Sequence, residues 1–287
     1  MMQIRFWGVR GTIPTPGPDT VRTGGNTSCI DILTTDNQLI IIDAGSGIRR
    51  LGMTIEEECP EQIKGTILIS HTHWDHIQGF PFFKPIVGPR GRHNRFTVIG
   101  QKRVGNQLEN ILAGQIIEPY LPFAFQELTA EIDFHEVVHG DSIQISPRTN
   151  IRVAELRHPG GCLGYRIEND DHVFAYCTDS SHADDMLTEA VLELADDADL
   201  LVHDAQYSLA QRATYSNYGH SSWKEATEVA NMAGVDCLAL FHYDPNATDD
   251  ELEQTRLQAR QLFPRTILSR EGLIINLPIT DDLIAVT

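Results

Sequence analysis

The chain has 287 residues, of which 41% are hydrophobic and 22% are charged, a composition typical of a globular protein rather than of a disordered chain or a small disulfide scaffold. Its 22 Lys and Arg residues against 40 Asp and Glu residues give a formal net charge of −18. Both nucleic-acid polymers and anionic membrane surfaces repel such a chain over roughly a Debye length, so we expect neither as a partner.

Apolar, β-rich segments bounded by turn residues predict strands along most of the chain. In chain order, the predicted strands span residues 3–7, 28–33, 38–43, 66–70, 96–100, 151–156, 164–167, 173–176, 200–203 and 237–241. The strand at 66–70 runs directly into a cluster of histidines. This cluster is notable because the chain contains twelve histidines, and imidazoles at ordinary surface positions contribute little charge at pH 7.

Helices are predicted over residues 104–117, 183–194, 223–233 and 249–263. The last two begin at capping boxes, Ser222 with Glu225 and Thr248 with Glu251, in which the hydroxyl and the carboxylate satisfy free backbone amides. Strands that are first consecutive and then interleaved with helices predict a layered α/β or α+β fold, with helices covering stacked sheets.

The chain has no linker, repeat or targeting signal that we can identify. The first residues lack a basic start followed by an apolar run, and no apolar stretch approaches the roughly 20 residues of a membrane span. The five cysteines are odd in number and form no CxxC pair, which is typical of reduced thiols. We expect one domain over residues 1–287 in a soluble, cytoplasmic protein, either monomeric or a homodimer.

The segment His71-Thr72-His73-Trp74-Asp75-His76 is the strongest functional signal. His71 and His73 project to one side as the chain leaves its strand, and Asp75 and His76 come from the following turn. Imidazole nitrogens and carboxylate oxygens suit Zn²⁺, Mn²⁺ or Fe²⁺, and the lack of nearby cysteines argues against a closed structural zinc site. The segment therefore predicts an open, catalytic metal site, with a polar surface loop as the alternative.

Three further candidate ligands, His158, Asp179 and His242, each follow a predicted strand. We expect the candidate ligands to form two sites, the first with His71, His73 and His158, the second with Asp75, His76 and His242, and Asp179 bridging them. The cofactors would then be two divalent metal ions. Zn²⁺ is the first expectation, with Mn²⁺ and Fe²⁺ as alternatives because such sites follow metal availability.

On these residues the chain resembles the metallo-β-lactamase fold superfamily, whose mark is an HxHxDH motif followed by a distant His, a bridging Asp and a last His. The resemblance covers nearly the whole chain and implies a four-layer αββα sandwich. Asp43, in Asp43-Ala44-Gly45-Ser46-Gly47, matches the early Asp-x-Gly element of the superfamily. The match implies that Asp43 orients the metal loop, and a plain turn residue is the alternative.

The ligand set reduces the number of superfamily branches to which the chain could belong. A β-lactamase of this fold would carry Cys in place of Asp179, and a flavodiiron protein would carry Glu in place of His73. Glyoxalase II-type thioesterases share all seven ligands, so a thioesterase or lactonase stays an alternative. Gly219-His220-Ser221-Ser222 resembles the His-Ser-Thr loop of the branch that contains tRNase Z and cyclic ribose-phosphate phosphodiesterases. That likeness implies that His220 donates a proton to the leaving oxygen.

Two other segments resemble the same branch. Asp204 lies in His203-Asp204-Ala205-Gln206, where tRNase Z has His-Glu-Ala-Thr, so we expect Asp204 to orient His220, although Asp replaces Glu. Asn26 lies in a Gly24–Ser28 segment that resembles an Arg-Asn loop, with Gly25 in place of the Arg. The alternatives are a capping neighbour without chemistry for His220 and a solvated carboxylate for Asp204.

These features predict a dinuclear phosphodiesterase in which a hydroxide shared by two metal ions attacks the phosphorus in line. The expected catalytic residues are His220 as general acid, Asp75 and Asp204. Enzymes of the tRNase Z type hold tRNA with a basic arm between the third ligand and the bridging Asp. Because only 21 positions separate His158 from Asp179, we expect a small anionic phosphodiester such as a cyclic nucleotide, and tRNA 3′ processing is the less favoured alternative.

Two segments are candidates for contacts with such a substrate. Residues 84–103 carry six Lys and Arg residues and no Asp or Glu, so they form a basic segment that suits phosphate, although a solvated loop is the alternative. Aromatic residues at 80–83 and 120–123 are candidates for the walls of a base pocket, with core packing as their alternative role.

Overall fold

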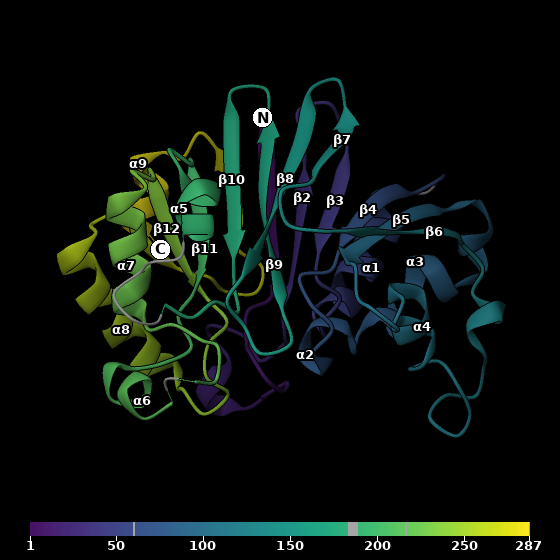
Figure 1. Cartoon of the computed structure of the whole chain (residues 1–287), viewed down its shortest axis with the longest axis horizontal. Helices are drawn as coiled ribbons and strands as arrows, with labels where there is room; N and C mark the ends of the chain where they lie inside the picture. Colours follow the sequence, from purple (N-terminus) through teal and green to yellow (C-terminus); the bar gives the residue numbers. More distant parts are fainter. Residues whose placement is uncertain (60, 183–188, 216, 287) are drawn as a thin grey trace.

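Two mixed β-sheets lie face to face between two layers of helices (Figure 1). The computed structural model describes residues 1–287 except residues 60, 183–188, 216 and 287. Helices α1, α3 and α4 lie on the outer side of one sheet and α5, α7 and α8 on that of the other, whereas α2 and α6 lie at the loop edge. The four-layer sandwich expected from the resemblance is therefore confirmed.

The first sheet has the order β14-β1-β2-β3-β4-β5-β6. Its strands are β1 (Met2–Gly8), β2 (Cys29–Leu33), β3 (Leu39–Ile42), β4 (Lys64–Leu68), β5 (Arg95–Gln101), β6 (Glu131–Val137) and β14 (Ile274–Leu277). The pairs from β14 to β3 are antiparallel, whereas β3, β4, β5 and β6 are parallel neighbours. Strand β3 shows why this sheet is buried on both sides, because Ile40 and Ile42 face the second sheet while Ile41 faces the helices.

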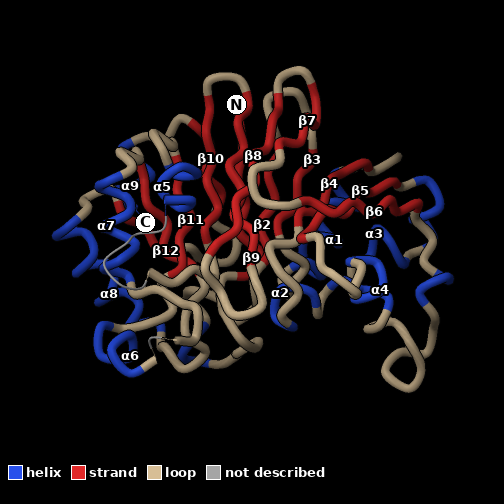
Figure 2. Tube along the Cα trace, viewed as in Figure 1, coloured by secondary structure: helices blue, strands red, loops and turns tan. Residues whose placement is uncertain are grey.

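The second sheet has the order β13-β12-β11-β10-β9-β8-β7. Its strands are β7 (Ser142–Ser146), β8 (Thr149–Leu156), β9 (Cys162–Asn169), β10 (His172–Cys177), β11 (Leu200–Asp204), β12 (Cys237–Phe241) and β13 (Thr266–Leu268). The strands from β7 to β10 are antiparallel, and those from β10 to β13 are parallel. Residues that follow β4, β8, β10 and β12 enter loops at one edge of the sandwich (Figure 2). This edge carries the candidate ligands.

The helices of the first side are α1 (Ile48–Glu58), α2 (Trp74–Ile77), α3 (Lys84–Val87) and α4 (Leu108–Ala113), and those of the second are α5 (Glu189–Ala195), α6 (Leu209–Thr214), α7 (Trp223–Met232), α8 (Asp249–Leu262) and α9 (Asp281–Val286). Short 3₁₀ segments occur at 18–20, 80–82, 89–93 and 125–127. Both predicted capping boxes are present, at Ser222 and Thr248. None of the described helices is long and apolar enough to cross a membrane.

Several elements differ from the sequence-based expectation. Strands β6, β7, β13 and β14 and helices α1, α3, α6 and α9 were not predicted, and the helix expected over 104–117 is confined to α4. Strand β4 ends at Leu68, and Asp75 and His76 lie in the helical turn α2 rather than in an irregular turn. The first part of the helix predicted over 183–194 lies outside the described residues, and α5 covers its second part.

The Thr248 cap should contribute measurably to stability. Its hydroxyl accepts from the Glu251 amide, and the Glu251 carboxylate accepts from the Thr248 amide at 2.8 Å. We expect Thr248→Ala to lower the free energy of unfolding by about 0.5–2 kcal/mol in urea titrations. Thr255→Ala is the control, since that hydroxyl only donates to a carbonyl of its own helix, and an equal loss in the two variants would contradict the cap assignment.

Candidate metal centre

All seven candidate ligands converge at the loop edge of the sandwich. They are His71, His73, Asp75 and His76 from the loop after β4 and from α2, His158 after β8, Asp179 after β10 and His242 after β12. The first four belong to the first sheet and the last three to the second sheet. The centre therefore lies across the two sheets, and sequence positions up to 171 residues apart meet in it.

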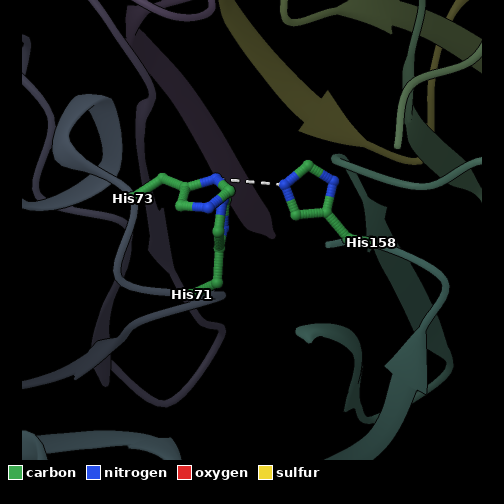
Figure 3. A group of neighbouring side chains, drawn as sticks. All are labelled: His71, His73 and His158. Atoms are coloured by element: carbon green, nitrogen blue, oxygen red, sulfur yellow. Dashed lines mark hydrogen bonds between the residues drawn. The ribbon is translucent and has the colours of Figure 1, made fainter. Parts of the chain in front are cut away.

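The first group consists of His71, His73 and His158, whose rings turn toward a common point (Figure 3). His73 Nδ1 lies 3.1 Å from His158 Nε2, and the His71 ring stands edge-on to both of the other rings. His71 Nε2 is buried and has no hydrogen-bond partner among the residues that the structure describes. A buried ring nitrogen without a partner is costly, and a metal ion at the common point would satisfy it.

Asp179 lies between the two groups and offers one carboxylate oxygen to each. Its Oδ1 is 3.8 Å from both His71 Nε2 and His158 Nε2, and its Oδ2 is 3.2 Å from His76 Nε2 and 3.4 Å from His242 Nε2. The Asp179 backbone has a positive φ of 52°, a conformation that Asp tolerates better than most residues. This placement would allow Asp179 to bridge ions held by the two groups.

The second group consists of Asp75, His76 and His242. The Nε2 atoms of the two histidines are 3.1 Å apart, and Asp75 Oδ2 lies 3.5 Å from the first and 3.2 Å from the second. The backbone amide of Thr12 donates to the same Asp75 oxygen at 2.6 Å. This contact was not foreseen, because a backbone donor from a distant loop leaves no signal in side-chain chemistry.

The protonation states of these groups suit metal binding. Burial, and then the neighbouring imidazoles, hold the pKa values of His71 and His73 below normal, so both rings are neutral and keep a lone pair. Burial opposes ionisation of Asp179, but the imidazoles around it outweigh burial and hold its pKa well below normal. Burial also lowers the pKa of His76, but Asp179, Asp75 and Asp43 together raise it well above normal, so this position favours positive charge.

The donor set therefore fits divalent metal ions. It offers imidazole nitrogens and carboxylate oxygens without thiolates, a combination that suits Zn²⁺ and other first-row ions. Two such ligands about 2.1 Å from a shared ion lie roughly 3–3.5 Å apart, and the ring contacts of 3.1 Å agree with that spacing. His73 is exposed, which leaves one side of the first group open to a substrate.

Residues behind the ligands fix the orientation of the rings. The buried Asp43 carboxylate contacts His76 Nδ1 at 2.8 Å and accepts from the Tyr176 hydroxyl at 2.8 Å and from the Ser70 amide at 2.8 Å. His158 Nδ1 contacts the Gly219 carbonyl at 3.0 Å. His242 Nδ1 contacts Gln206 Oε1 at 2.9 Å. Contacts of this kind set the tautomer and direction of metal-ligating imidazoles.

His220 lies next to this cluster and is held by Asp204. Its Nδ1 is 2.8 Å from Asp204 Oδ2, and its ring is 5.1 Å from the His242 ring and 5.2 Å from the His158 ring, centroid to centroid. Asp204 is buried and also accepts from the amides of Asp179 and Ser221. Burial lowers the pKa of His220, but the charge and the hydrogen bond of Asp204 outweigh burial and raise it to about 9.

Asn26 contacts the loop that follows Asp43. Its Oδ1 accepts from the Ser46 hydroxyl at 2.9 Å, and its Nδ2 donates to Glu271 at 3.0 Å. Ser46 belongs to the loop that follows Asp43. Asn26 therefore ties the Asp43 loop to a segment near the C-terminus.

Much of the basic segment is engaged within the protein. Lys84 pairs with Glu56 at 2.6 Å, Arg90 donates to the Glu56 carbonyl, and Arg95 pairs with Glu131 at 3.0 Å. Arg103 differs from these three, because its Nη2 lies 3.4 Å from the Gly161 carbonyl in the loop that also carries His158. Of these four side chains, only that of Arg103 contacts a loop of the metal centre.

Comparisons with known proteins agree with the fold. Residues 38–243 match a family model described as the Beta-lactamase superfamily domain. A Ribonuclease Z of Treponema pallidum is 23% identical over 298 residues, covering 85% of this chain and 90% of that protein. The crystal structure of the metallo-β-lactamase fold protein YhfI from Bacillus subtilis superimposes with a TM-score of 0.71 at 19% identity, covering 95% of this chain and 98% of the other. The structure of a new diphosphatase from the PhnP family gives a TM-score of 0.70 at 19% identity over 97% and 99% of the two chains.

These relatives correct one expectation. The net charge of −18 led us to expect no nucleic-acid polymer as a partner, yet several relatives carry the name Ribonuclease Z. The inference was wrong because the net charge is a sum over the whole surface. In 0.1 M salt, screening limits the range over which each surface charge acts to about 10 Å. Whether a polymer binds therefore depends on the protein charges near the segment that is bound, and not on the net charge of the whole chain.

The bridging geometry predicts the metal content. We expect the purified protein to bind two divalent ions per chain, measured by mass spectrometry of the metal after dialysis, and Asp179→Asn to bind one or fewer, because an amide offers one acceptor oxygen instead of two. Asp196→Asn, the same change at an exposed position, is the control. Two ions retained in Asp179→Asn would contradict the bridging role.

Proposed function

We propose that this chain, which belongs to the metallo-β-lactamase superfamily, is a metal-dependent phosphodiesterase with His71, His73, Asp75, His76, His158, Asp179 and His242 as its metal ligands. The observation that carries the proposal is the His220–Asp204 pair beside these ligands. A hydrolase that expels an alkoxide needs a proton donor beside its metal ligands, because an alkoxide is a poor leaving group until it is protonated.

The divalent ions, when bound, would supply the attacking water and neutralise charge on the phosphoryl oxygens. The remaining chemistry belongs to the protein. Asp204 engages Nδ1 of His220, which leaves Nε2 to carry the proton for the leaving oxygen. A pKa raised to about 9 keeps His220 protonated at neutral pH. Asp204 is itself fixed by the amides of Gln206 at 3.1 Å and Ser221 at 3.0 Å.

The same pair favours a phosphodiester over a thioester. A thiolate leaves without prior protonation far more readily than an alkoxide does, so a thioesterase gains little from a positioned imidazolium. In a site for thioesters, the buried pair of Asp204 and His220 would have no role in the reaction. We therefore place thioester hydrolysis second among reactions. A lactone also expels an alkoxide, so the substrate panel below has to separate lactone from phosphodiester hydrolysis.

We further propose a small cyclic phosphodiester, such as a cyclic nucleotide, as the substrate. Between His158 and Asp179 the chain forms only a short loop and the tight β9–β10 hairpin, with register pairs from Tyr165–Tyr176 to Asn169–His172. That hairpin leaves no room for an inserted arm. The second candidate is the 3′ trailer of a tRNA precursor, and the relatives named Ribonuclease Z favour it.

A substrate panel tests the proposal. We expect the protein reconstituted with Zn²⁺, Mn²⁺ or Fe²⁺ to hydrolyse bis-(p-nitrophenyl) phosphate and a cyclic nucleotide with at least 100-fold higher kcat/KM than S-lactoylglutathione or a lactone. A thioester turned over faster than every diester would refute the phosphodiesterase. Faster cleavage of a tRNA precursor than of any cyclic nucleotide would replace the small substrate by the second candidate.

Removal of the proposed acid should depend on the leaving group. We expect His220→Ala to lower kcat for a cyclic nucleotide by about 10²–10⁴-fold and to lower kcat for bis-(p-nitrophenyl) phosphate much less, because nitrophenolate leaves without a proton. His93→Ala, a change at an exposed histidine, should leave both rates unchanged. Equal losses on the two substrates, at unchanged metal content, would show that His220 is not the acid.

A further inference from the structure

A cavity of about 410 Å³ lies beside the metal loop, between α2, the 3₁₀ turn at 80–82 and the segment that follows α4. The residues that line it are Trp74, Gln78, Pro81, Phe82, Gly114, Gln115, Tyr120 and Leu121. Its volume falls within the range of small-molecule sites, about 300–1,000 Å³. No lining residue is charged, so the cavity suits a neutral, planar group better than a phosphate.

Three of the lining residues are large aromatics that the fold leaves in solvent. Trp74 is 61% exposed, Phe82 53% and Tyr120 74%. A single exposed aromatic ring is common on protein surfaces. Three such rings around one cavity form a surface on which a flat ring can stack. Successive nucleic-acid bases bind aromatic side chains in this way, because every base has a π-face.

Besides Gln78, whose Nε2 donates to Thr27 Oγ1 at 3.0 Å, Gln115 supplies the polar part of the cavity. It is 7% exposed, and neither its Oε1 nor its Nε2 has a hydrogen-bond partner among the described residues. A buried amide with both atoms unpaired is costly to the folded protein. The amide offers one donor and one acceptor side by side, which matches the edge of a nucleobase that presents an acceptor next to a donor.

The chain connects this cavity directly to the metal centre. Trp74 stands between His73 and Asp75 in sequence and opens α2, the helical turn that carries Asp75 and His76. Trp74 and Gln78 are four positions apart, so they share the face of this turn that lines the cavity. One helical turn therefore carries both the candidate ligands Asp75 and His76 and two residues that line the cavity.

We propose that this cavity is the base subsite of the enzyme, in which the Trp74, Phe82 and Tyr120 rings stack against a nucleobase of the substrate and the Gln115 amide hydrogen-bonds its edge. This inference rests on the proposed phosphodiesterase activity. It narrows the substrate from any phosphodiester to one that carries a base on its sugar, and it makes Gln115 a specificity-determining residue.

The test compares two inhibitors that differ only in the base. With the holoenzyme and bis-(p-nitrophenyl) phosphate as substrate, we expect AMP to inhibit at a concentration at least tenfold lower than ribose 5-phosphate. Gln115→Met keeps the length of the side chain but removes its hydrogen bonds, and it should reduce this ratio to about threefold or less. Gln126→Met, the same change in an exposed 3₁₀ turn, should leave the ratio unchanged. Equal inhibition by AMP and ribose 5-phosphate in the wild type would overturn the proposal.

A second variant tests the base edge itself. Gln115→Glu replaces the donor by a second acceptor, so it should favour GMP, whose N1–H and N2–H donors are adjacent, over AMP by about tenfold relative to the wild type. An unchanged order of inhibition among AMP, GMP, CMP and UMP would refute hydrogen bonding by Gln115.

A binding measurement separates this proposal from the activity. Trp7 and Trp223 are buried, so Trp74 is the exposed tryptophan of the three in the chain. We expect AMP, but not ribose 5-phosphate, to quench the tryptophan fluorescence of the holoenzyme, and Trp74→Phe to abolish the quenching. If the wild type hydrolyses no diester but shows this quenching, the proposed function fails and the base subsite stands. If it hydrolyses diesters without quenching, the base subsite fails alone.

Discussion

The arrangement of the metal centre depends on one buried carboxylate, that of Asp43. It follows β3 with a φ of 62°, is fully buried, and contacts groups from three directions. Ser70 donates to it from the end of the first sheet, Tyr176 from the second sheet, and His76 meets it from the metal loop. A buried carboxylate is tolerated only when its charge is compensated by such partners. Because these partners come from both sheets, compensating Asp43 also aligns the sheets and places the loop between them.

The convergence of the candidate ligands could largely be predicted from the sequence because these residues stand where apolar runs end. The HxHxDH segment places four candidate ligands within six residues, and His158, Asp179 and His242 each follow a buried strand. The supporting contacts could not be predicted in the same way. The Thr12 amide and the Gly219 carbonyl are backbone groups, so the residue type says nothing about their position. Gln115 also has no motif, and only the fold shows that its amide is buried without partners.

The missed elements share physical causes. The N-cap residue of helix α1 is Gly47, which provides no side-chain cap, so the start of this helix carries no signal in the sequence. Strands β6 and β7 alternate between partly buried and exposed residues at the rim of the sandwich, where polar residues dilute the apolar pattern. Strand β14 pairs with β1 from the opposite end of the chain, as in the pair Met2–Leu277. Local patterns contain no information on a partner that is so distant in sequence.

The division of the ligands between the two sheets has a consequence for the folded protein as a whole. His71, His73, Asp75 and His76 belong to one half of the sandwich, and His158, Asp179 and His242 belong to the other. Ions that bind to both halves fasten them together, and binding energy gained only in the folded state adds to its stability. Ions bound across the two groups of ligands would therefore stabilise the packing of one sheet on the other, as well as supply the chemistry of the site.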